Sequence, residues 1–155
     1  MKIVIFKMAS REYGVDIRQV REVIRMKEII PVPESSEFVE GVISLRGAVV
    51  PVINMRKKFG LENKAREKTN RIIVTHINRQ IVGVIVDEVM DVIYTEEGNI
   101  APPDEVLKDA EYLTGVAKTA ERLILMMDLE KILSGKEKMN IEKVQKRVEV
   151  RKKHG

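Results

Sequence analysis

The chain contains no cysteine and no tryptophan, and it has only two histidines in 155 residues. The absence of cysteine excludes disulfides and thiolate metal sites, and it fits a cytoplasmic protein. Aromatic residues make up 4% of the sequence, with three phenylalanines and three tyrosines, which leaves few side chains for stacking nucleic-acid bases. His76 lies in a strand-like segment and His154 near the end of the sequence, and we expect both to be exposed.

Long apolar runs are also missing. The longest, such as Ala48–Ile53, fall far below the ~18 residues that a membrane-spanning helix needs. Met1 leads directly into a charged residue and a strand-like segment, so we expect no signal peptide. A hydrophobic content of 44% with 34% charged residues predicts a soluble globular protein, large enough for one compact domain or two small ones that share a core.

Charge is unevenly distributed along the chain. Residues 1–133 hold 20 Lys and Arg against 21 Asp and Glu, a net charge of −1, whereas residues 134–155 hold 8 against 3, a net charge of +5. The basic character therefore belongs to the tail, and it does not indicate a nucleic-acid-binding body. Ile141, Val144 and Val148 recur in the tail at helical spacing. This spacing predicts an amphipathic helix docked on the body; a frayed basic extension and attachment to a membrane surface are the alternatives.

The sequence repeats itself. Residues 2–24 align without gaps with residues 71–93 at an offset of 69, and residues 38–59 align with residues 112–133 at an offset of 74. Four glycines fall at matched positions, Gly14 with Gly83 and Gly41 with Gly115. The blocks keep their order and nearly their spacing, which predicts an internal duplication with halves at about 2–60 and 71–133.

Each half predicts the same series of elements. A β-hairpin comes first, then a short helix at 17–24 or 86–93, then a second pair of strands. Asn54 and Asp128 stand where an N-cap would start a final short helix, and Gly60 and Gly135 stand where that helix would end.

Many short strands with close turns indicate a mainly β fold class, built as two small barrels around a shared hydrophobic core. The halves of the sequence need not equal the barrels in space, which leaves room for strands to be exchanged between the barrels. The polar segment 61–69 reads as the boundary between halves, and the proline-containing segment 99–111 as an exposed loop. We therefore expect a single domain at 2–133 followed by a basic tail at 134–155.

Catalytic patterns are scarce. Asp87, Glu88 and Asp91 could be imagined as a carboxylate cluster, but the predicted helix would place Asp87 and Asp91 on its solvent face. The first half has no matching acidic set, and the chain has no phosphate-binding glycine loop, nucleophile triad or metal-ligand spacing. We expect a binding protein, with no catalytic residue, metal site or cofactor.

The stretch "GVISLRGAVVPVINM", residues 41–55, reads as a hairpin with apolar strands on both sides of Arg46–Gly47. Gly47 permits a tight turn, and Pro51 indicates a strand end or an edge strand because it lacks an N–H donor. In the repeat alignment, Ala120–Glu121 occupy the position of Arg46–Gly47. We infer that the fold does not need an arginine there and that Arg46 faces a partner.

Four ordered elements of the sequence resemble the CheW family of bacterial chemotaxis coupling proteins. They are "YGVDIRQVREVI" (13–24), "GVISLRGAVVPV" (41–52), "VGVIVDEVMDV" (82–92) and the segment 111–133 that begins "EYLTG". The resemblance covers about residues 2–133 at consistent spacing. Ser44 stands where the family usually has asparagine, and the tail has no counterpart that can be carried over.

The resemblance implies two SH3-like five-stranded β-barrels from an internal duplication, packed around a common core. It also implies a non-enzymatic adaptor in a two-component signalling system. The partners would be the regulatory domain of a CheA-type histidine kinase and the cytoplasmic tip of methyl-accepting chemoreceptors. That kinase domain is itself CheW-like, so the two would pair barrel to barrel. The adaptor would be a monomer in isolation, would form rings within arrays, and would lie in the cytoplasm at receptor arrays, touching the membrane only through receptors.

The same resemblance implies the partner-binding residues. They are three positions of the first predicted helix and the "LRG" element: Val20, Glu22, Val23, Leu45, Arg46 and Gly47. Val20 and Val23 could instead belong to the core, and Arg46 could be an ordinary surface arginine in a turn. The alternative function is a small β-barrel that binds nucleic acid and carries a basic tail; steeply salt-dependent RNA binding by the body would favour it. A CheW-like part of a larger protein is a further, disfavoured reading.

Overall fold

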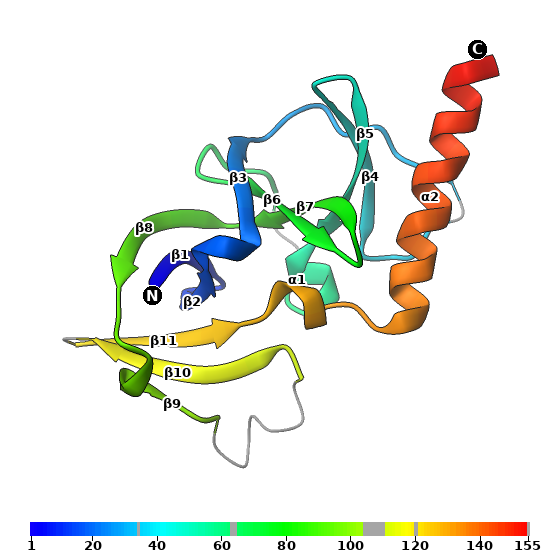
Figure 1. Ribbon diagram of the computed structural model, residues 1–155. Coiled ribbons are helices and arrows are strands. Elements are labelled where there is room, and N and C mark those ends of the chain that lie inside the picture. The colour runs from blue at the N-terminus through cyan, green and yellow to red at the C-terminus, as the bar shows by residue number, and fades with distance from the viewer. Residues whose placement is uncertain (34, 63–64, 104–110, 120, 155) are drawn as a thin grey trace.

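The computed structural model describes residues 1–33, 35–62, 65–103, 111–119 and 121–154, with the side chains of 149–154 excepted. Within this part of the chain, strands dominate and form two sheets (Figure 1). The order in the first sheet is β8 (Glu88–Tyr94), β1 (Lys2–Met8), β2 (Arg11–Asp16), β11 (Arg122–Met127), β10 (Leu113–Thr119) and β9 (Ile100–Ala101). The order in the second is β3 (Val20–Arg25), β6 (Arg71–Ile77), β7 (Gln80–Val86), β5 (Ala48–Asn54) and β4 (Val39–Leu45). The prediction of a mainly β fold with two subdomains is confirmed.

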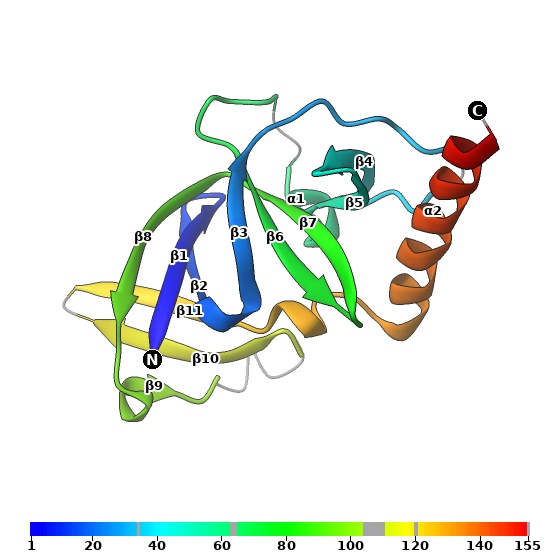
Figure 2. The same ribbon diagram turned by 45° about the horizontal axis from the view of Figure 1, so that its top comes forward.

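Each sheet combines strands from both halves of the sequence. β8 leaves the second half and pairs with β1, while β3 leaves the first half and pairs with β6. Parallel pairs, β2 with β11 and β5 with β7, complete the exchange. Figure 2 shows β3 in the middle of the molecule beside β6, and β8 leading from there along the outer side of the first sheet beside β1. The halves of the sequence therefore do not coincide with the two sheets.

The prediction of helices at 17–24 and 86–93 is wrong. Both segments are edge strands, β3 and β8, and the first is preceded only by the three-residue 3-10 helix η1 (Ile17–Gln19). Along β3, partly buried and exposed side chains alternate. Valine and isoleucine at these positions fit either period over eight residues, and their stiff β-branched side chains favour the extended chain once a neighbouring strand is present.

The two predicted N-caps and the predicted helix end at Gly60 are confirmed. The Asn54 side chain accepts a hydrogen bond from Lys57 N (3.3 Å) at the start of α1 (Met55–Lys58). The Asp128 side chain accepts a hydrogen bond from Glu130 N (3.0 Å) at the start of η3 (Leu129–Lys131). Gly60 follows α1 in the left-handed region, with φ +69°.

Gly135, predicted to end a helix, instead begins the long helix α2 (Gly135–His154). Ser134 and Glu137 form a capping box at that point. The Ser134 hydroxyl accepts from Glu137 N (3.1 Å), and the Glu137 carboxylate accepts from Ser134 N (2.8 Å). This reciprocal cap satisfies backbone donors that the first helical turn would otherwise leave unpaired, so the helix starts here.

Residues that match in the repeat make matched contacts. A Cβ on Gly14 would lie 2.6 Å from Ile3 Cγ2, and a Cβ on Gly83 would lie 2.8 Å from the matching Cγ2 of Ile72. A Cβ on Gly41 would lie 2.1 Å from the Ile30 carbonyl oxygen, and a Cβ on Gly115 would lie 2.7 Å from the Ala101 carbonyl oxygen, both on antiparallel neighbouring segments. These glycines therefore mark places where a side chain or another backbone segment closes on the strand.

A large hydrophobic core lies between the two sheets, and a smaller one lies within each. The shared core contains a row of aromatic rings, with centroid separations of 5.7, 6.5 and 4.6 Å, in the order Phe6, Tyr13, Phe59 and Tyr112. The first sheet encloses a cluster around Ile5 and Ile124, and the second encloses one around Val52 and Ile72. The predicted shared core is confirmed, and it joins the two subdomains into one packed unit.

Pro51 was predicted to lie at a strand end or on an edge strand, and this prediction is wrong. It is buried in the middle of β5, an interior strand between β7 and β4. The pairs between β5 and β7 run from Val52 to Asn54, so the ladder with β7 begins one residue after the proline. The missing N–H is tolerated because that part of β5 has no ladder with β7. Of the predicted loop at 99–111, residues 104–110 lie outside the described residues.

Substituting Gly41 with alanine should lower the free energy of unfolding by about 3 kcal/mol, because the new Cβ would overlap the Ile30 carbonyl and φ is +145°. Chemical denaturation measures the effect. Gly98→Ala is the matched control, since its Cβ would enter open space and should change stability by less than about 0.5 kcal/mol. Equal effects of the two substitutions would contradict the close approach at Gly41.

Candidate functional site

A salt bridge connects two of the predicted partner-binding residues across the second sheet. Arg46 Nη1 lies 2.9 Å from Glu22 Oε1, and Arg46 Nη2 lies 2.8 Å from Glu22 Oε2. This is the two-pronged geometry that a planar guanidinium forms with a carboxylate. Glu22 comes from the edge strand β3 and Arg46 from the turn between β4 and β5. We call this pair the clasp.

The turn places Arg46 at the tip of the β4–β5 hairpin. Leu45 pairs with Ala48, and the two residues between them have positive φ, 50° at Arg46 and 82° at Gly47. Two positive φ values are the mark of the type I′ turn that suits the twist of a two-residue hairpin. The predicted hairpin is therefore confirmed. The Lys27 ammonium donates a hydrogen bond to the Ser44 carbonyl and so provides a further contact to the β4–β5 hairpin.

The clasp keeps Glu22 ionised. The hydrogen bond from Arg46 lowers the pKa of the Glu22 carboxyl below its ordinary value, and the same bond raises the pKa of Arg46. Because the folded-state pKa of Glu22 is depressed, the pair contributes stability above the ordinary glutamate pKa. That contribution is lost as the pH falls through the lower, folded-state pKa. Both charges are thus in place at neutral pH.

The other predicted residues divide between surface and core. Val23 is exposed on β3, at 38% of its surface, and Gly47 is exposed at the turn. Val20 is half-buried and packs against the shared core, while Leu45 is half-buried against the cluster within the second sheet. The structure thus brings Glu22 and Arg46 together at the surface, while Val20 and Leu45 pack inward against two separate core clusters.

A second arginine–acid pair stands at the matching place in the first sheet. Arg122 Nη1 and Nη2 each lie 3.0 Å from an Asp91 carboxylate oxygen, and Arg122 Nε and Nη2 each lie 3.1 Å from a Glu12 oxygen. Asp91 is the repeat counterpart of Glu22, and Arg122 closes the β10–β11 hairpin opposite Thr119. Hydrogen bonds from Arg122 lower the pKa of Asp91.

The second pair overturns the inference that the fold needs no arginine at this hairpin. The arginine is present in both halves, but in the second it lies two positions beyond the residue that the repeat alignment matches with Arg46. In both halves a β-bulge, at Arg21 and at Met90, comes just before the acid, and a bulge changes the direction in which the following side chains point.

The two arginines differ in exposure. Arg122 is bound by two carboxylates and is 31% exposed, whereas Arg46 is bound by Glu22 alone among the described residues and is 69% exposed. A surface ion pair of this kind contributes little to stability. Arg46 therefore retains accessible donors that a partner could use, and Arg122 has far fewer.

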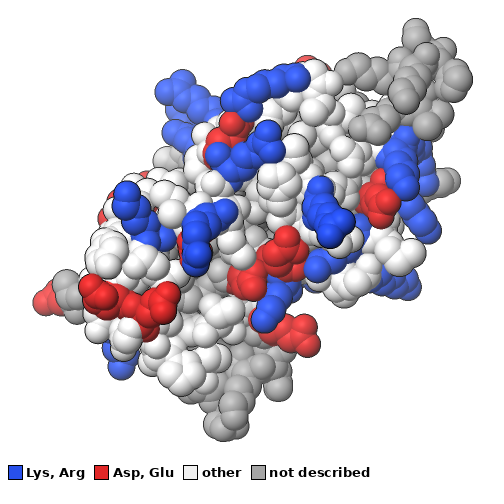
Figure 3. Space-filling model, in the orientation of Figure 1, with Lys and Arg blue, Asp and Glu red and all other residues white. Residues whose placement is uncertain are grey.

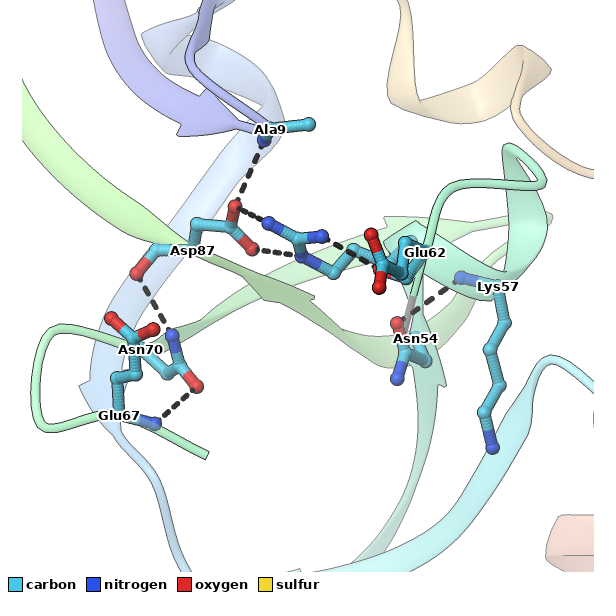
Figure 4. Close-up of polar contacts among 8 residues, drawn as sticks. Ala9, Asn54, Lys57, Glu62, Glu67, Asn70 and Asp87 are labelled. Carbon is cyan, nitrogen blue, oxygen red and sulfur yellow. Dashed lines mark hydrogen bonds and ion pairs between the residues drawn. The ribbon is translucent and has the colours of Figure 1, made fainter. Parts of the chain in front are cut away.

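Asp87 was predicted to lie on the solvent face of a helix, and this prediction is wrong. The residue instead connects three segments of the chain by hydrogen bonds (Figure 4). Its carboxylate accepts from Arg56 Nε (2.7 Å) and from Ala9 N in the β1–β2 turn (2.9 Å). Its backbone carbonyl accepts from Asn70 Nδ2 (3.0 Å), and Arg56 Nη1 reaches the Glu62 carbonyl (2.7 Å). The Arg56–Asp87 ion pair therefore has a structural role. Together with the bonds to Glu62 and Asn70, it fixes the segment between the two halves of the sequence against α1 and β1.

An exposed apolar stripe on β8 was missed by sequence reasoning. Val92 and Tyr94 are 52% and 66% exposed, and as alternate residues of a strand they share one face; Met90, at the bulge, is also exposed. We call these three residues the β8 stripe. β8 is an edge strand, and exposed apolar groups on an edge are typical of docking surfaces. The alternation of apolar residues was the available signal, but a helical period was assigned to it.

The described part of the chain shows no candidate metal centre, and charges of both signs lie on the face in view. Among the described residues, no group of three or more His, Cys, Asp or Glu could hold a metal ion. Figure 3 shows basic and acidic side chains interspersed across the face seen in Figure 1. His76 is exposed, as expected, with Nε2 lying 3.3 Å from Arg21 Nη1. No helix in the described part of the chain is long and apolar enough to span a lipid bilayer.

The chain is similar to known proteins over most of its length. The family model of the CheW-like domain matches residues 2–137. The chemotaxis protein CheW of Klebsiella aerogenes is 33% identical over 147 residues, which cover 94% of this chain and 89% of that protein. The chemotaxis protein CheW of Helicobacter pylori is 35% identical over 129 residues, 83% and 78% of the two chains. The crystal structure of the scaffolding protein TtCheW from Thermoanaerobacter tengcongensis superimposes with a TM-score of 0.81 and 39% identity, covering 88% and 94%.

Replacing Arg46 with alanine should raise the pKa of Glu22 toward 4.5, the ordinary glutamate value, because the hydrogen bond that lowers it is removed. NMR titration of the Glu22 side-chain carboxyl measures this change. Arg79→Ala, which removes an exposed arginine from the β6–β7 turn, should leave the titration as it is in the unaltered protein. An unchanged Glu22 pKa in the Arg46 variant would contradict the clasp.

Proposed function

The chain belongs to the CheW-like family, and we propose that it is a non-enzymatic adaptor that couples chemoreceptors to a CheA-type histidine kinase in bacterial chemotaxis. The observation that carries the proposal is the family match over residues 2–137, which spans both sheets and the hairpins that carry Arg46 and Arg122. The relatives described above are chemotaxis proteins, and the similar solved structure is a scaffolding protein.

An adaptor of this kind needs two separate surfaces held in a fixed relation. The clasp lies on the second sheet and the β8 stripe on the first, and the shared core with its row of aromatic rings lies between the sheets. A packed core does not deform continuously, so a displacement at one surface is transmitted to the other as a rigid movement. The adaptor would thereby let a receptor change shift the kinase between active and inactive states.

We assign the receptor tip to the clasp surface. Its predicted contact residues are Val20, Glu22, Val23, Leu45, Arg46 and Gly47. Among them, Arg46 offers an exposed guanidinium and Val23 an exposed apolar group, while Val20 and Leu45 support the surface from the core side. An arginine beside an apolar patch is a typical centre of a protein interface, because it combines buried area with directional hydrogen bonds.

We assign the kinase regulatory domain to the β8 stripe. An edge strand with Val92 and Tyr94 exposed suits the barrel-to-barrel pairing that the family resemblance implies. Repetition of such contacts would build rings within receptor arrays, with the isolated protein monomeric. The protein would lie in the cytoplasm at those arrays and meet the membrane only through receptors.

The alternative of a nucleic-acid-binding barrel has no support in the relatives or in the solved structure described above. Residues 1–133 carry a net charge of −1, and the face in Figure 3 carries both basic and acidic groups. Non-specific nucleic-acid binding depends on a positive surface that displaces counterions. The charge distribution of the body therefore favours a protein partner.

Binding of the purified protein to a receptor cytoplasmic fragment and to the kinase regulatory domain from the same cell tests the proposal directly. We expect saturable binding to both at micromolar protein, measured by calorimetry. The absence of binding to either partner at that concentration would overturn it. Tight binding of RNA whose affinity falls steeply with salt would favour the alternative instead.

Arg46→Glu should weaken binding of the receptor fragment by about tenfold or more, because it reverses the charge at the centre of the surface. Kinase-domain binding and thermal stability should change little, and Arg79→Glu is the matched control in another two-residue hairpin turn. The double exchange Glu22→Arg with Arg46→Glu can reform the salt bridge with its charges reversed. If the double exchange restores receptor binding, Arg46 acts only through the clasp and not by contact with the receptor.

A further inference from the structure

The helix α2 (Gly135–His154) is a docked element whose length lies mostly beyond the family match, which ends at residue 137. Figures 1 and 2 show it standing beside β4 and β5, on the side of the second sheet away from the first. Ile141 is buried in the shared core, and Val144 is buried in a separate cluster with Val42 of β4 and Val49 of β5. A salt bridge of 2.9 Å between Lys58 and Glu137 fixes its first turn to α1.

The strands that α2 covers lack a complete ladder of their own. β5 pairs with β7 only from Val52 to Asn54, although β5 begins at Ala48. β4 is an edge strand that pairs with β5, with a single further bridge between Val42 and Ile30. The outer part of the β4–β5 hairpin is therefore a two-stranded ribbon, and such a ribbon is marginally stable in water without further packing.

Gln145 of α2 closes the gap between β5 and β7 where their ladder is absent. Its Nε2 donates to the Val49 carbonyl (3.0 Å), and its Oε1 accepts from Gln80 Nε2 of β7 (2.5 Å). Gln80 Nε2 also lies 3.4 Å from the Ile141 carbonyl. A groove remains beside these contacts, lined by the first residues of β5, the β6–β7 turn and α2. One glutamine side chain thus takes the place of a missing strand contact.

The same helix reaches the other strand of the hairpin indirectly. Arg147 Nη1 donates to the Pro33 carbonyl (2.9 Å), in the segment that crosses β4. Ile30 of that segment exchanges two backbone hydrogen bonds of 2.9 Å with Val42. Val49, which Gln145 holds, is directly opposite Ser44, one pair away from the residues that close the Arg46–Gly47 turn.

We propose that α2 is a brace that positions the Arg46–Gly47 turn for receptor binding, with Gln145 as the main positioning residue. The inference rests on the proposed function, because it assigns the tail a role at the same surface. Gln145 contacts neither Arg46 nor Glu22; it acts through Val49 and the ribbon. Without this contact the ribbon would sample more conformations, and the receptor would bind only the fraction in which the clasp is correctly placed.

The test is Gln145→Ala in the full chain. We expect faster hydrogen exchange at the backbone amides of residues 44–50 and a Glu22 pKa that moves toward 4.5 as the clasp loosens. Affinity for the receptor fragment should fall about three- to tenfold, while affinity for the kinase domain stays the same. Lys143→Ala is the matched control, because Lys143 is exposed on the same helix and has no ion pair among the described residues; it should change none of these quantities.

A double-substitution cycle separates positioning from general stabilisation. In a chain that already carries Arg46→Ala, Gln145→Ala should cause no further loss of receptor affinity, because the group it positions is gone. Equal losses with and without Arg46 would overturn the proposal, and so would unchanged exchange at residues 44–50. Exchange and the Glu22 titration need no receptor. If the unaltered protein binds no receptor fragment while Gln145→Ala still changes both, the proposed function fails and the brace remains as a structural device only.

Discussion

The exchange of strands between the two halves is the constraint on which the rest of this structure depends. The β1–β2 hairpin obtains its outer neighbour, β8, from the second half, and the β6–β7 hairpin obtains β3 from the first. A half of about 60 residues buries too little apolar surface to be stable alone, and here neither half contains all the strands of a sheet. Folding therefore requires both halves at once, which makes the clasp and the β8 stripe parts of one cooperative unit.

Local features of the fold were predictable from the sequence, and pairings between distant residues were not. Asn54 and Asp128 cap their helices as expected, and the matched glycines occupy matched crowded positions, because caps and close approaches leave a mark on single residues. The strands β3 and β8 were mistaken for helices since eight residues fit both periods. The ion pairs of Asp87 with Arg56 and of Arg122 with Asp91 each join residues 31 positions apart in sequence, and no local pattern reports them.

The candidate site illustrates the same division. The resemblance directed attention to Glu22 and Arg46, but their mutual hydrogen bonds became visible only in the structure, because β3 and the β4–β5 hairpin lie at opposite ends of the strand order. The repeat concealed the second pair, because Arg122 lies two positions away from the aligned residue. Comparison of the two pairs then distinguishes their roles. Arg122 is saturated by two carboxylates, and Arg46, with one, combines a structural contact with an accessible charge.

The β8 stripe has a consequence for the protein in the absence of its partner. An uncovered edge strand with exposed valine and tyrosine is a template for edge-to-edge aggregation. Two features of β8 counter this hazard: the bulge at Met90 interrupts its regular edge, and Asp91 places a charge between the apolar groups. Asp91 thus acts as a gatekeeper as well as the ion-pair partner of Arg122, because its charge opposes edge-to-edge association while the strand is uncovered.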